Sequence, residues 1–262
     1  RDRLRSRGLG DVYKRQGMYN PPKMIVDLNA QILPDMGCGP ESCSEAAQIL
    51  VKLGEQGVTH VVAAPRFNRY DESVPHFITR RGEAMAKFSA YLSQNRMSHV
   101  PQLVMGALVS FTDNMADEPE LESLCISDTN YMLVELPSVP ATEELIGSFK
   151  KLACGGRVRP LLAHIEKYAA YADEEALAEL FSSASGQINC DSVFSAAGIR
   201  YAARLIKGGS ICGLGSGRCS LDDPPRYSEA RKKLSRKLGA ALFNESVSRS
   251  EAVLSNGDII KP

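Results

Sequence analysis

Short apolar runs alternate with longer amphipathic stretches along the chain from Met24 onward. Runs rich in Val, Ile and Leu predict buried strands, and segments whose apolar positions recur every three or four residues predict helices. The predicted strands are Met24–Leu28, Val58–Ala64, Val100–Val109, Tyr131–Leu136, Arg159–Ala163, Gln187–Cys190 and Ser210–Leu214. The predicted helices are Pro40–Gln56, Val74–Asn95, Thr142–Ala153, Asp173–Phe181, Phe194–Lys207 and Pro225–Phe243.

This order of elements predicts an α/β fold with parallel strands. Strands that alternate with helices and lack hairpin turns pair in parallel, with the helices as crossovers. A barrel of about seven strands fits the pattern, although periodicity alone does not separate it from a doubly wound open sheet. In both architectures the ligand site lies in the loops after the carboxyl ends of the strands. We find no internal repeat or long linker, so residues 18–262 are expected to form a single domain.

Composition excludes several classes of partner. The chain has 262 residues, of which 44% are hydrophobic and 24% charged, as in ordinary globular proteins. Its formal net charge is zero, which argues against a nucleic-acid partner, so the basic run Arg231–Lys237 predicts a solvated helix face. No apolar run reaches the roughly 18 residues that a membrane span needs. The seven cysteines are dispersed without zinc-site spacing, and we expect reduced thiols in a cytoplasm.

The first residues differ from the rest of the chain. Residues 1–16 carry six positive and two negative side chains and little apolar periodicity. Asp11–Gln16 is what the codons GAT GTG TAT AAG AGA CAG encode, and that string matches a transposon end used to prepare sequencing libraries. We therefore expect residues 1–17 to be adapter-derived and outside the fold, with Met18 or Met24 as the natural start. The alternative is a native basic arm that binds an acidic surface.

Four motifs at the predicted strand ends carry a family resemblance. Asp27–Pro34 is similar to Asp-x-His-x-His-Ile-Leu-Pro, and Ala63–Arg66 to Ala-Thr-Pro-His. Leu161–Tyr168 resembles Ile-Ala-His-Pro-Glu-Arg-Tyr, and Leu214–Arg218 stands in the place of Ala-Ser-Asp-Ala-His. These are motifs of the bacterial capsular polysaccharide biosynthesis tyrosine phosphatases, a family of the PHP (polymerase and histidinol phosphatase) superfamily. The resemblance continues in order along nearly the whole chain.

The resemblance implies a PHP-type distorted (βα)7 TIM-like barrel with parallel strands and crossover helices. It also implies a cluster of divalent metals such as manganese, held by histidines and carboxylates, which activates a water that hydrolyses phosphotyrosine. By the same analogy, the partner is a phosphotyrosine protein or a bacterial tyrosine kinase, and the role is the regulation of capsule or exopolysaccharide synthesis.

The metal-ligand positions of the family are mostly substituted in this chain. The corresponding residues are Asn29, Gln31, Gly37, Arg66, Leu108, His164, Ser216 and Arg218. Only His164 keeps a usable ligand, because a neutral amide replaces imidazole or carboxylate poorly and an arginine repels a metal ion. We therefore expect a pseudoenzyme that has no metal and no other cofactor.

Two of these substitutions are cationic and suggest another use for the pocket. If the loops keep their family positions, Arg66 and Arg218 point into it beside His164 and Lys167. Arginine binds phosphate through bidentate, charge-assisted hydrogen bonds without any metal. These four residues are therefore the candidates for binding a phosphorylated ligand.

Two alternatives remain open at this point. In one, each arginine forms an ion pair with an acid such as Glu166 or Asp27 and only fills the space. In the other, the chain is an active phosphatase, through residual metal chemistry or through Cys212, since Cys212–Arg218 fits the Cys-x-x-Gly-x-x-Arg spacing of cysteine-dependent phosphatases. In that chemistry a low-pKa thiolate attacks phosphorus while loop amides and the arginine hold the oxyanion. A buried strand position would instead keep the Cys212 thiol protonated.

Overall fold

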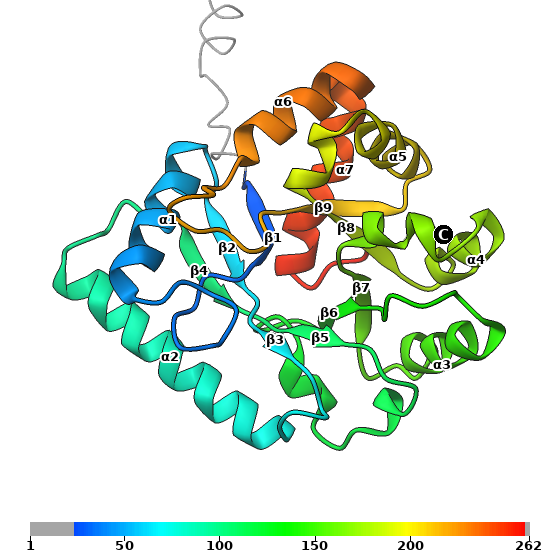
Figure 1. Ribbon diagram of the computed structural model, residues 1–262, viewed down its shortest axis with the longest axis horizontal. Coiled ribbons are helices and arrows are strands. Elements are labelled where there is room, and N and C mark those ends of the chain that lie inside the picture. The colour runs from blue at the N-terminus through cyan, green and yellow to red at the C-terminus, as the bar shows by residue number, and fades with distance from the viewer. Residues whose placement is uncertain (1–23, 260–262) are drawn as a thin grey trace, which may run out of the picture.

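Nine parallel strand segments form one continuous sheet in the computed structural model, which describes residues 24–259 (Figure 1). The segments are β1 (Val26–Ala30), β2 (His60–Ala63), β3 (Arg66–Phe67), β4 (Gln102–Met105), β5 (Leu108–Ser110), β6 (Tyr131–Glu135), β7 (Arg159–Leu162), β8 (Ser185–Asn189) and β9 (Ile211–Gly215). Their order in the sheet is β3-β5-β6-β7-β8-β9-β1-β2-β4. The predicted α/β class with parallel strands is confirmed.

Two strands are interrupted, and this turns nine segments into a barrel of seven strands. Ala64 and Pro65 separate β2 from β3, and Gly106 and Ala107 separate β4 from β5. Because β2 pairs with β4, β3 with β5 and β9 with β1, every strand of the ring has a neighbour on both sides. Buried Arg81 donates from Nη1 to the carbonyl of Gly106 (2.9 Å) and so satisfies a backbone group at one break. The predicted distorted (βα)7 barrel is confirmed.

Seven α-helices of the described residues flank the strands, five of them as crossovers between strands and two after β9 (Figure 1). They are α1 (Cys43–Glu55), α2 (Val74–Gln94), α3 (Glu143–Cys154), α4 (Glu174–Phe181), α5 (Ala196–Lys207), α6 (Tyr227–Leu238) and α7 (Ala240–Leu254). Five of them begin at a side chain that accepts a backbone N–H of the first turn, namely Ser42, Ser73, Thr142, Asp173 and Ser195. None of the helices in this part of the chain is long and apolar enough to span a membrane.

The largest departure from the predicted elements lies near the carboxyl end. A single helix was predicted over Pro225–Phe243, whereas the structure has α6 and α7 separated at Gly239. Gly239 has a φ of +85°, a conformation that side-chain-bearing residues rarely adopt, so the chain turns there. The predicted strand Val100–Val109 is likewise two segments, because the chain breaks at Gly106.

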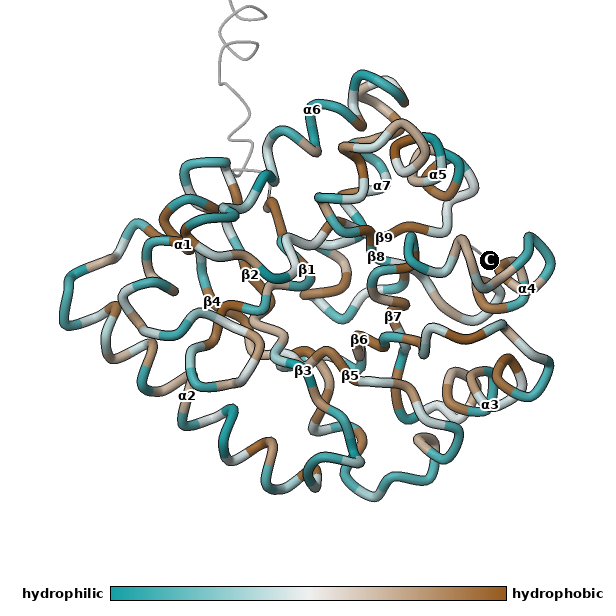
Figure 2. Tube along the Cα trace, in the orientation of Figure 1, coloured by the Kyte–Doolittle hydropathy of each residue, from teal (hydrophilic) through white to brown (hydrophobic). Residues whose placement is uncertain are grey.

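The apolar residues form two cores, one on each face of the sheet. The larger core packs the helices against the outside of the barrel. The smaller core fills the barrel interior with strand residues that include Leu28, Leu108 and Leu133, together with Val253 of α7 and Ile259. Figure 2 shows hydrophobic strands at the centre of the molecule and hydrophilic positions along the outer helices. The filled interior confines the polar strand-end residues to the rim.

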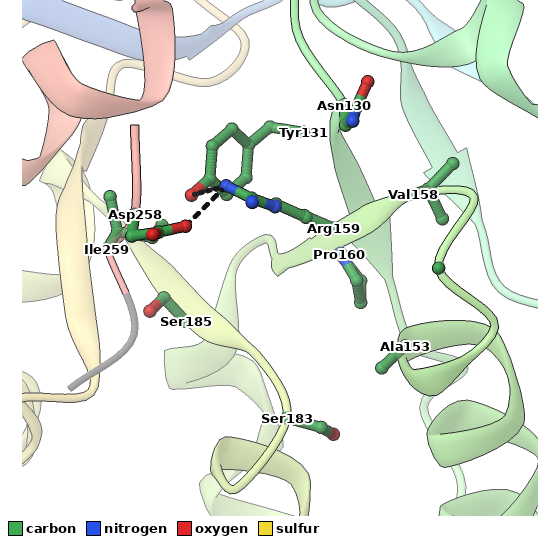
Figure 3. Close-up of a pocket in the computed structure, with 11 residues that line it drawn as sticks. Asn130, Tyr131, Ala153, Val158, Arg159, Pro160, Ser183, Ser185, Asp258 and Ile259 are labelled. Atoms are coloured by element: carbon green, nitrogen blue, oxygen red, sulfur yellow. Dashed lines mark hydrogen bonds and ion pairs between the residues drawn. The ribbon is translucent and has the colours of Figure 1, made fainter. Parts of the chain in front are cut away.

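The segment after α7 crosses the amino-terminal end of the barrel (Figure 3). The carbonyl of Gly257 accepts a hydrogen bond from the Tyr131 hydroxyl (2.6 Å). Asp258 forms an ion pair with Arg159 (2.9 Å), whose guanidinium lies over the Tyr131 ring. A cavity of about 660 Å³ lies beside this contact, and its charged groups are already paired with each other. The opposite, carboxyl-terminal end of the strands therefore remains the better place to look for a site.

Candidate functional site

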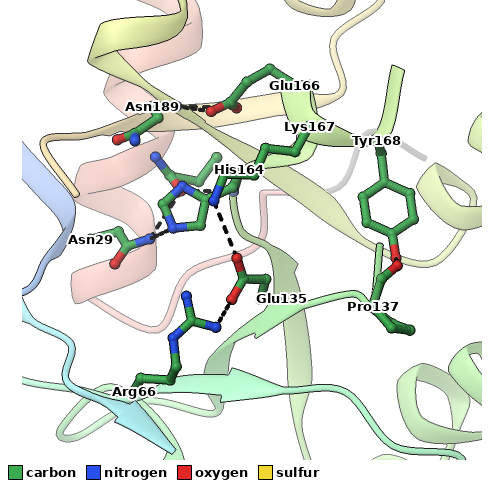
Figure 4. A network of polar contacts seen from close by, with 10 residues as sticks. Asn29, Arg66, Glu135, Pro137, His164, Glu166, Lys167, Tyr168 and Asn189 are labelled. Carbon is green, nitrogen blue, oxygen red and sulfur yellow. Dashed lines mark hydrogen bonds and ion pairs between the residues drawn. The ribbon is translucent and has the colours of Figure 1, made fainter. Parts of the chain in front are cut away.

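Five polar side chains from distant parts of the sequence meet at the carboxyl ends of the strands, and four of them are labelled in Figure 4. Asn29 comes from β1, Arg66 from β3, Glu135 from β6 and Gln187 from β8, while His164 follows β7. Parallel strands bring these positions together because all their carboxyl ends lie at one rim of the barrel. The sequence predicts a ligand site at these strand ends for the same reason.

His164 is a buried and neutral member of this cluster. It adopts a left-handed backbone conformation (φ +52°) as the chain leaves β7. The Asn29 side-chain nitrogen lies 3.2 Å from His164 Nε2, and the His164 backbone N–H donates to Gln187 Oε1 (3.2 Å). Burial lowers the pKa of His164 to about 4, with further lowering by Lys167 and a partial offset by Glu135. The imidazole therefore carries no charge at neutral pH.

Asp27 holds the loop that follows β9. It is fully buried, and its Oδ1 accepts the backbone N–H groups of Ser216 (2.9 Å) and Asn29 (3.2 Å). Burial raises the pKa of this carboxyl to about 6, although the hydrogen bonds from Ser216 and Asn29 lower it again in part. Asp27 therefore orients backbone, and it forms no ion pair with either arginine, contrary to one of the alternatives above.

Glu135 organises the cations of the rim, and sequence reasoning missed it. Its carboxylate forms ion pairs with Arg66 and with Lys167 (3.4 Å), and the Glu135 side chain is only 14% exposed. Burial by itself raises the pKa of Glu135, but the hydrogen bond and charge of Arg66, with His164 and Lys167, outweigh it and leave the pKa below its ordinary value. The carboxylate is thus ionised at neutral pH. Arg66 does pair with an acid, but with Glu135 rather than with Glu166 or Asp27.

Glu166 faces away from these cations. Both of its carboxylate oxygens accept the backbone N–H of Asn189 at 3.2 Å. Burial raises the pKa of Glu166 to about 7, and the hydrogen bond from Asn189 and the charge of Lys167 offset only part of that rise. Glu166 is therefore divided between its neutral and charged forms at physiological pH.

Arg218 is the rim cation that has no partner. It is exposed and makes no hydrogen bond or ion pair with any residue of the 24–259 range. The preceding Gly217 is fixed to β1, because its N–H donates to the Asn29 carbonyl (2.7 Å) and its carbonyl accepts from the Gln31 N–H (2.9 Å). The backbone that carries Arg218 is therefore anchored at the same rim as Asn29.

Several buried polar atoms at this rim lack hydrogen-bond partners within the described part of the chain. They are Asp27 Oδ2, Asn29 Oδ1, His164 Nδ1, Gln187 Nε2 and Asn189 Oδ1. Buried polar groups are normally satisfied, and a group of unsatisfied ones is typical of a place that receives a ligand or water.

Comparison with known proteins decides the family. The family model described as "Capsular polysaccharide synthesis, CpsB/CapC" matches residues 25–254. The chain belongs to the CpsB/CapC family. The predicted resemblance to the capsular tyrosine phosphatases is thereby confirmed.

Individual members of the CpsB/CapC family resemble this chain over almost its whole length. The tyrosine-protein phosphatase CpsB of Streptococcus agalactiae serotype V is 21% identical over 88% of this chain and 99% of its own length. The CpsB of serotype III of the same species has the same identity and coverage. A crystal structure reported for YwqE of Bacillus subtilis and CpsB of Streptococcus pneumoniae superposes with a TM-score of 0.77 at 19% identity, covering 91% of this chain and 97% of that one. The PHP-type barrel is the shared fold.

The expectation that this chain uses no cofactor is contradicted by the comparison with solved structures. The superposed structures are described as those of "unique metal-dependent tyrosine phosphatases". The expectation rested on the substituted ligand positions of this chain alone, although the family resemblance itself implies divalent metals.

The residues of this chain do not fit such a metal centre. The eight corresponding positions, Asn29, Gln31, Gly37, Arg66, Leu108, His164, Ser216 and Arg218, supply one imidazole and two guanidinium groups. Leu108 is fully buried in the inner core, and Gly37 has no side chain to offer. Within residues 24–259, no three His, Cys, Asp or Glu side chains are grouped so that they could hold a metal ion. We therefore derive no chemical step through a metal here.

Cys212 lies where a thiolate is disfavoured. It is fully buried on β9 and belongs to the inner apolar core. Burial raises its pKa to about 12, and its Sγ donates to the carbonyl of Gly186 (3.4 Å). A cysteine nucleophile needs a lowered pKa and access to the phosphoryl group, and this position offers neither.

Proposed function

We propose that this CpsB/CapC-family chain binds a phosphorylated ligand at the carboxyl ends of its strands without hydrolysing it. The observation that carries the proposal is the uneven charge of the rim. Arg66, Lys167 and Arg218 supply three positive charges with access to solvent, whereas Glu135 is the carboxylate that pairs with two of them. A phosphate dianion would balance this excess through charge-assisted hydrogen bonds.

The three cations contribute unequally in this proposal. Arg66 already donates to Glu135, and its side chain is 38% exposed. Lys167 shares the same carboxylate at the longer distance of 3.4 Å, and its side chain is 52% exposed. Arg218 makes no ion pair with the described residues, so it has the most binding capacity to offer. We assign the principal contact to Arg218, a second to Lys167, and an orienting contribution to Arg66.

The absence of hydrolysis follows from the acids and bases near the rim. Hydrolysis of a phosphate ester needs an activated nucleophile beside the phosphorus. The imidazole of His164 is buried, with Nε2 against Asn29, and the carboxylate of Asp27 is committed to the backbone of Ser216. Both side chains are almost fully buried, so neither reaches the phosphorus of an ester bound at the solvent side of the rim, and the ligand is expected to remain intact.

The partner we propose is a phosphotyrosine protein, such as a bacterial tyrosine kinase, within the regulation of capsule or exopolysaccharide synthesis. The names of the relatives support this partner, since they are tyrosine-protein phosphatases. We place this chain and its phosphotyrosine partner in the cytoplasm. All seven cysteines are unpaired, which agrees with a reducing compartment.

Calorimetric titration tests the binding. Phosphotyrosine and inorganic phosphate are titrated into the wild type, Arg218→Ala, Lys167→Ala and the control Arg236→Ala, which removes an exposed arginine of α6. Loss of one charge-assisted hydrogen bond weakens binding by about tenfold or more. We expect that weakening for Arg218→Ala, a smaller one for Lys167→Ala and none for Arg236→Ala. Equal binding by all four proteins contradicts the proposal.

An active phosphatase is the second candidate, and the whole-length superposition on metal-dependent tyrosine phosphatases favours it. Hydrolysis of p-nitrophenyl phosphate, measured with and without added manganese, separates the two. Turnover that rises with manganese and saturates with substrate supports the phosphatase. A hydrolysis rate equal to that of a protein-free blank supports binding without hydrolysis.

A further inference from the structure

A second cavity lies next to the rim, on the side away from Arg66. It has a volume of about 480 Å³ and is bounded by the 3-10 helices Ile165–Ala170 and Cys190–Phe194 and by the first turns of α5. Its size falls within the range of small-molecule sites. The phosphate-binding proposal makes no use of this cavity.

An unpartnered hydroxyl and a buried carboxyl line this cavity together. The Tyr201 hydroxyl oxygen is buried and has no hydrogen-bond partner of normal geometry among the described residues. Burial raises the pKa of Tyr201, and Arg204, which lies over its ring, offsets the rise only in part. Glu166 contributes its carboxyl group, which is also held by the backbone of Asn189. With a pKa raised by burial to about 7, this carboxyl both donates and accepts hydrogen bonds near neutral pH.

The remaining lining combines hydroxyl groups, one cation and small apolar surfaces. The Ser192 hydroxyl donates to the carbonyl of Asn189 (2.7 Å) and keeps its oxygen as an acceptor, the Ser195 hydroxyl is held at the start of α5 by the N–H of Gly198 (2.9 Å), and Arg200 forms no ion pair within the described residues. Ala197 and Gly198 add little bulk and leave an apolar face at the start of α5. The lining thus offers the Tyr201 hydroxyl, the Glu166 carboxyl and the Arg200 guanidinium as polar groups, a formal charge of zero when Glu166 is ionised, and room for a ring.

We propose that this cavity is a binding site for a saccharide, namely one or two sugar rings with free hydroxyl groups. A sugar presents neighbouring hydroxyls that both donate and accept, and these match the Tyr201 hydroxyl, the Glu166 carboxyl and the acceptor oxygen of Ser192. Its C–H faces match the small apolar surface, and it carries no net charge, as the lining requires. A strongly anionic ligand fits less well, because it would stand against the Glu166 carboxylate. The site is independent of phosphate binding at the rim.

Saturation-transfer NMR with a panel of sugars tests the assignment. The probes are the uncharged sugars glucose, galactose, N-acetylglucosamine and maltose, each at about 10 mM, which reveals dissociation constants up to the millimolar range. The variant Tyr201→Phe keeps the ring and removes the hydroxyl, with Tyr171→Phe, which lies outside the cavity lining, as its control. The variant Ala197→Trp fills the cavity, with Ala178→Trp on the exposed face of α4 as its control.

We expect saturation transfer from the wild-type protein to at least one sugar. The transfer should disappear in Ala197→Trp and remain in Ala178→Trp. Tyr201→Phe should weaken the affinity about three- to tenfold, the effect of one hydrogen bond, and Tyr171→Phe should leave it unchanged. The assignment is overturned if no sugar in the panel binds. It is equally overturned if Ala197→Trp binds as the wild type does, or if inorganic phosphate competes for this cavity better than any sugar. Phosphate affinity at the rim is measured separately, so either proposal can fail without the other.

Discussion

Replacing Glu135 by glutamine should strengthen the binding of phosphate while weakening the fold slightly. The Glu135 carboxylate neutralises part of the charge on Arg66 and Lys167, and glutamine keeps the shape of the side chain but removes the charge. A phosphorylated ligand that contacts these cations should therefore bind more tightly to Glu135→Gln than to the wild type. If Arg66 only fills space, the substitution should leave phosphate affinity unchanged. Glu135→Gln therefore distinguishes an Arg66 that contacts phosphate from one that is only structural.

The magnitude follows from the geometry of the ion pair. Lys167 Nζ lies 3.4 Å from Glu135 Oε1, so a phosphate oxygen on the far side of the ammonium group would lie about 6 Å from the carboxylate. At that separation, with an effective dielectric constant between about 40 and 80, one repulsive unit charge costs about 0.7–1.4 kcal/mol. Removing it should tighten phosphate binding by about three- to tenfold. Partly exposed ion pairs contribute about 0.2–1 kcal/mol each, so the loss of both pairs should lower the thermal midpoint by about 1–8 °C.

Calorimetry with phosphotyrosine and a thermal scan at low and moderate salt provide the two readouts. The control is Glu179→Gln, which removes the partner of Lys150 on the surface of α3 and α4. That control should leave phosphate affinity unchanged. Weaker or unchanged phosphate affinity in Glu135→Gln, in protein that is still folded, would refute the reasoning, because the freed cations would then have no contact with the ligand.

Three further predictions follow. Burial raises the pKa of Asp27 to about 6 from an unfolded value near 3.8, so the folded state binds the carboxyl proton more tightly than the unfolded state does. The contribution of Asp27 to stability is therefore greatest below about pH 4. It declines by on the order of 2–3 kcal/mol as the pH rises to about 6. A pH series of thermal midpoints should show a smaller decline in Asp27→Asn than in the wild type, and equal slopes would contradict this. Cys212→Ser places a hydroxyl among apolar neighbours in the barrel and should lower stability by about 1–2 kcal/mol in a denaturant titration. Phosphate affinity should stay unchanged. If the substitution abolished a measurable phosphatase turnover, the cysteine mechanism would be restored. Deleting residues 1–16, which lie outside the described residues, should leave the thermal midpoint unchanged, and a fall of several degrees would show a native, docked segment.

The elements of the barrel could be predicted because their signals are local. The apolar runs before Asn29 and Glu135 and the amphipathic period of α2 depend only on neighbouring residues, and each appears in the structure close to its predicted bounds. The break at Gly239 also had a local signal, since a glycine within a helical pattern weakens the helix. It was outweighed by the apolar positions that continue on both sides of it.

The partners within the site could not be predicted, because they depend on barrel closure. Glu135 meets Arg66 only because β3 pairs with β5 and β5 with β6, and no spacing along the chain reveals that contact. Glu166 was proposed as a partner for an arginine, but the turn after His164 aims it at the backbone of Asn189 instead. The identities of the rim residues were readable from motifs, whereas their pairing required the three-dimensional register.

Phosphorus NMR of phosphotyrosine mixed with the wild type and with Arg218→Ala tests the central claim most directly, since one spectrum reports both binding and hydrolysis. We predict that the phosphotyrosine resonance broadens or shifts with the wild type, does so much less with Arg218→Ala, and is not replaced by inorganic phosphate during the incubation. Accumulation of inorganic phosphate in proportion to the wild-type protein, or a resonance that is unaffected at about millimolar ligand, would contradict the account.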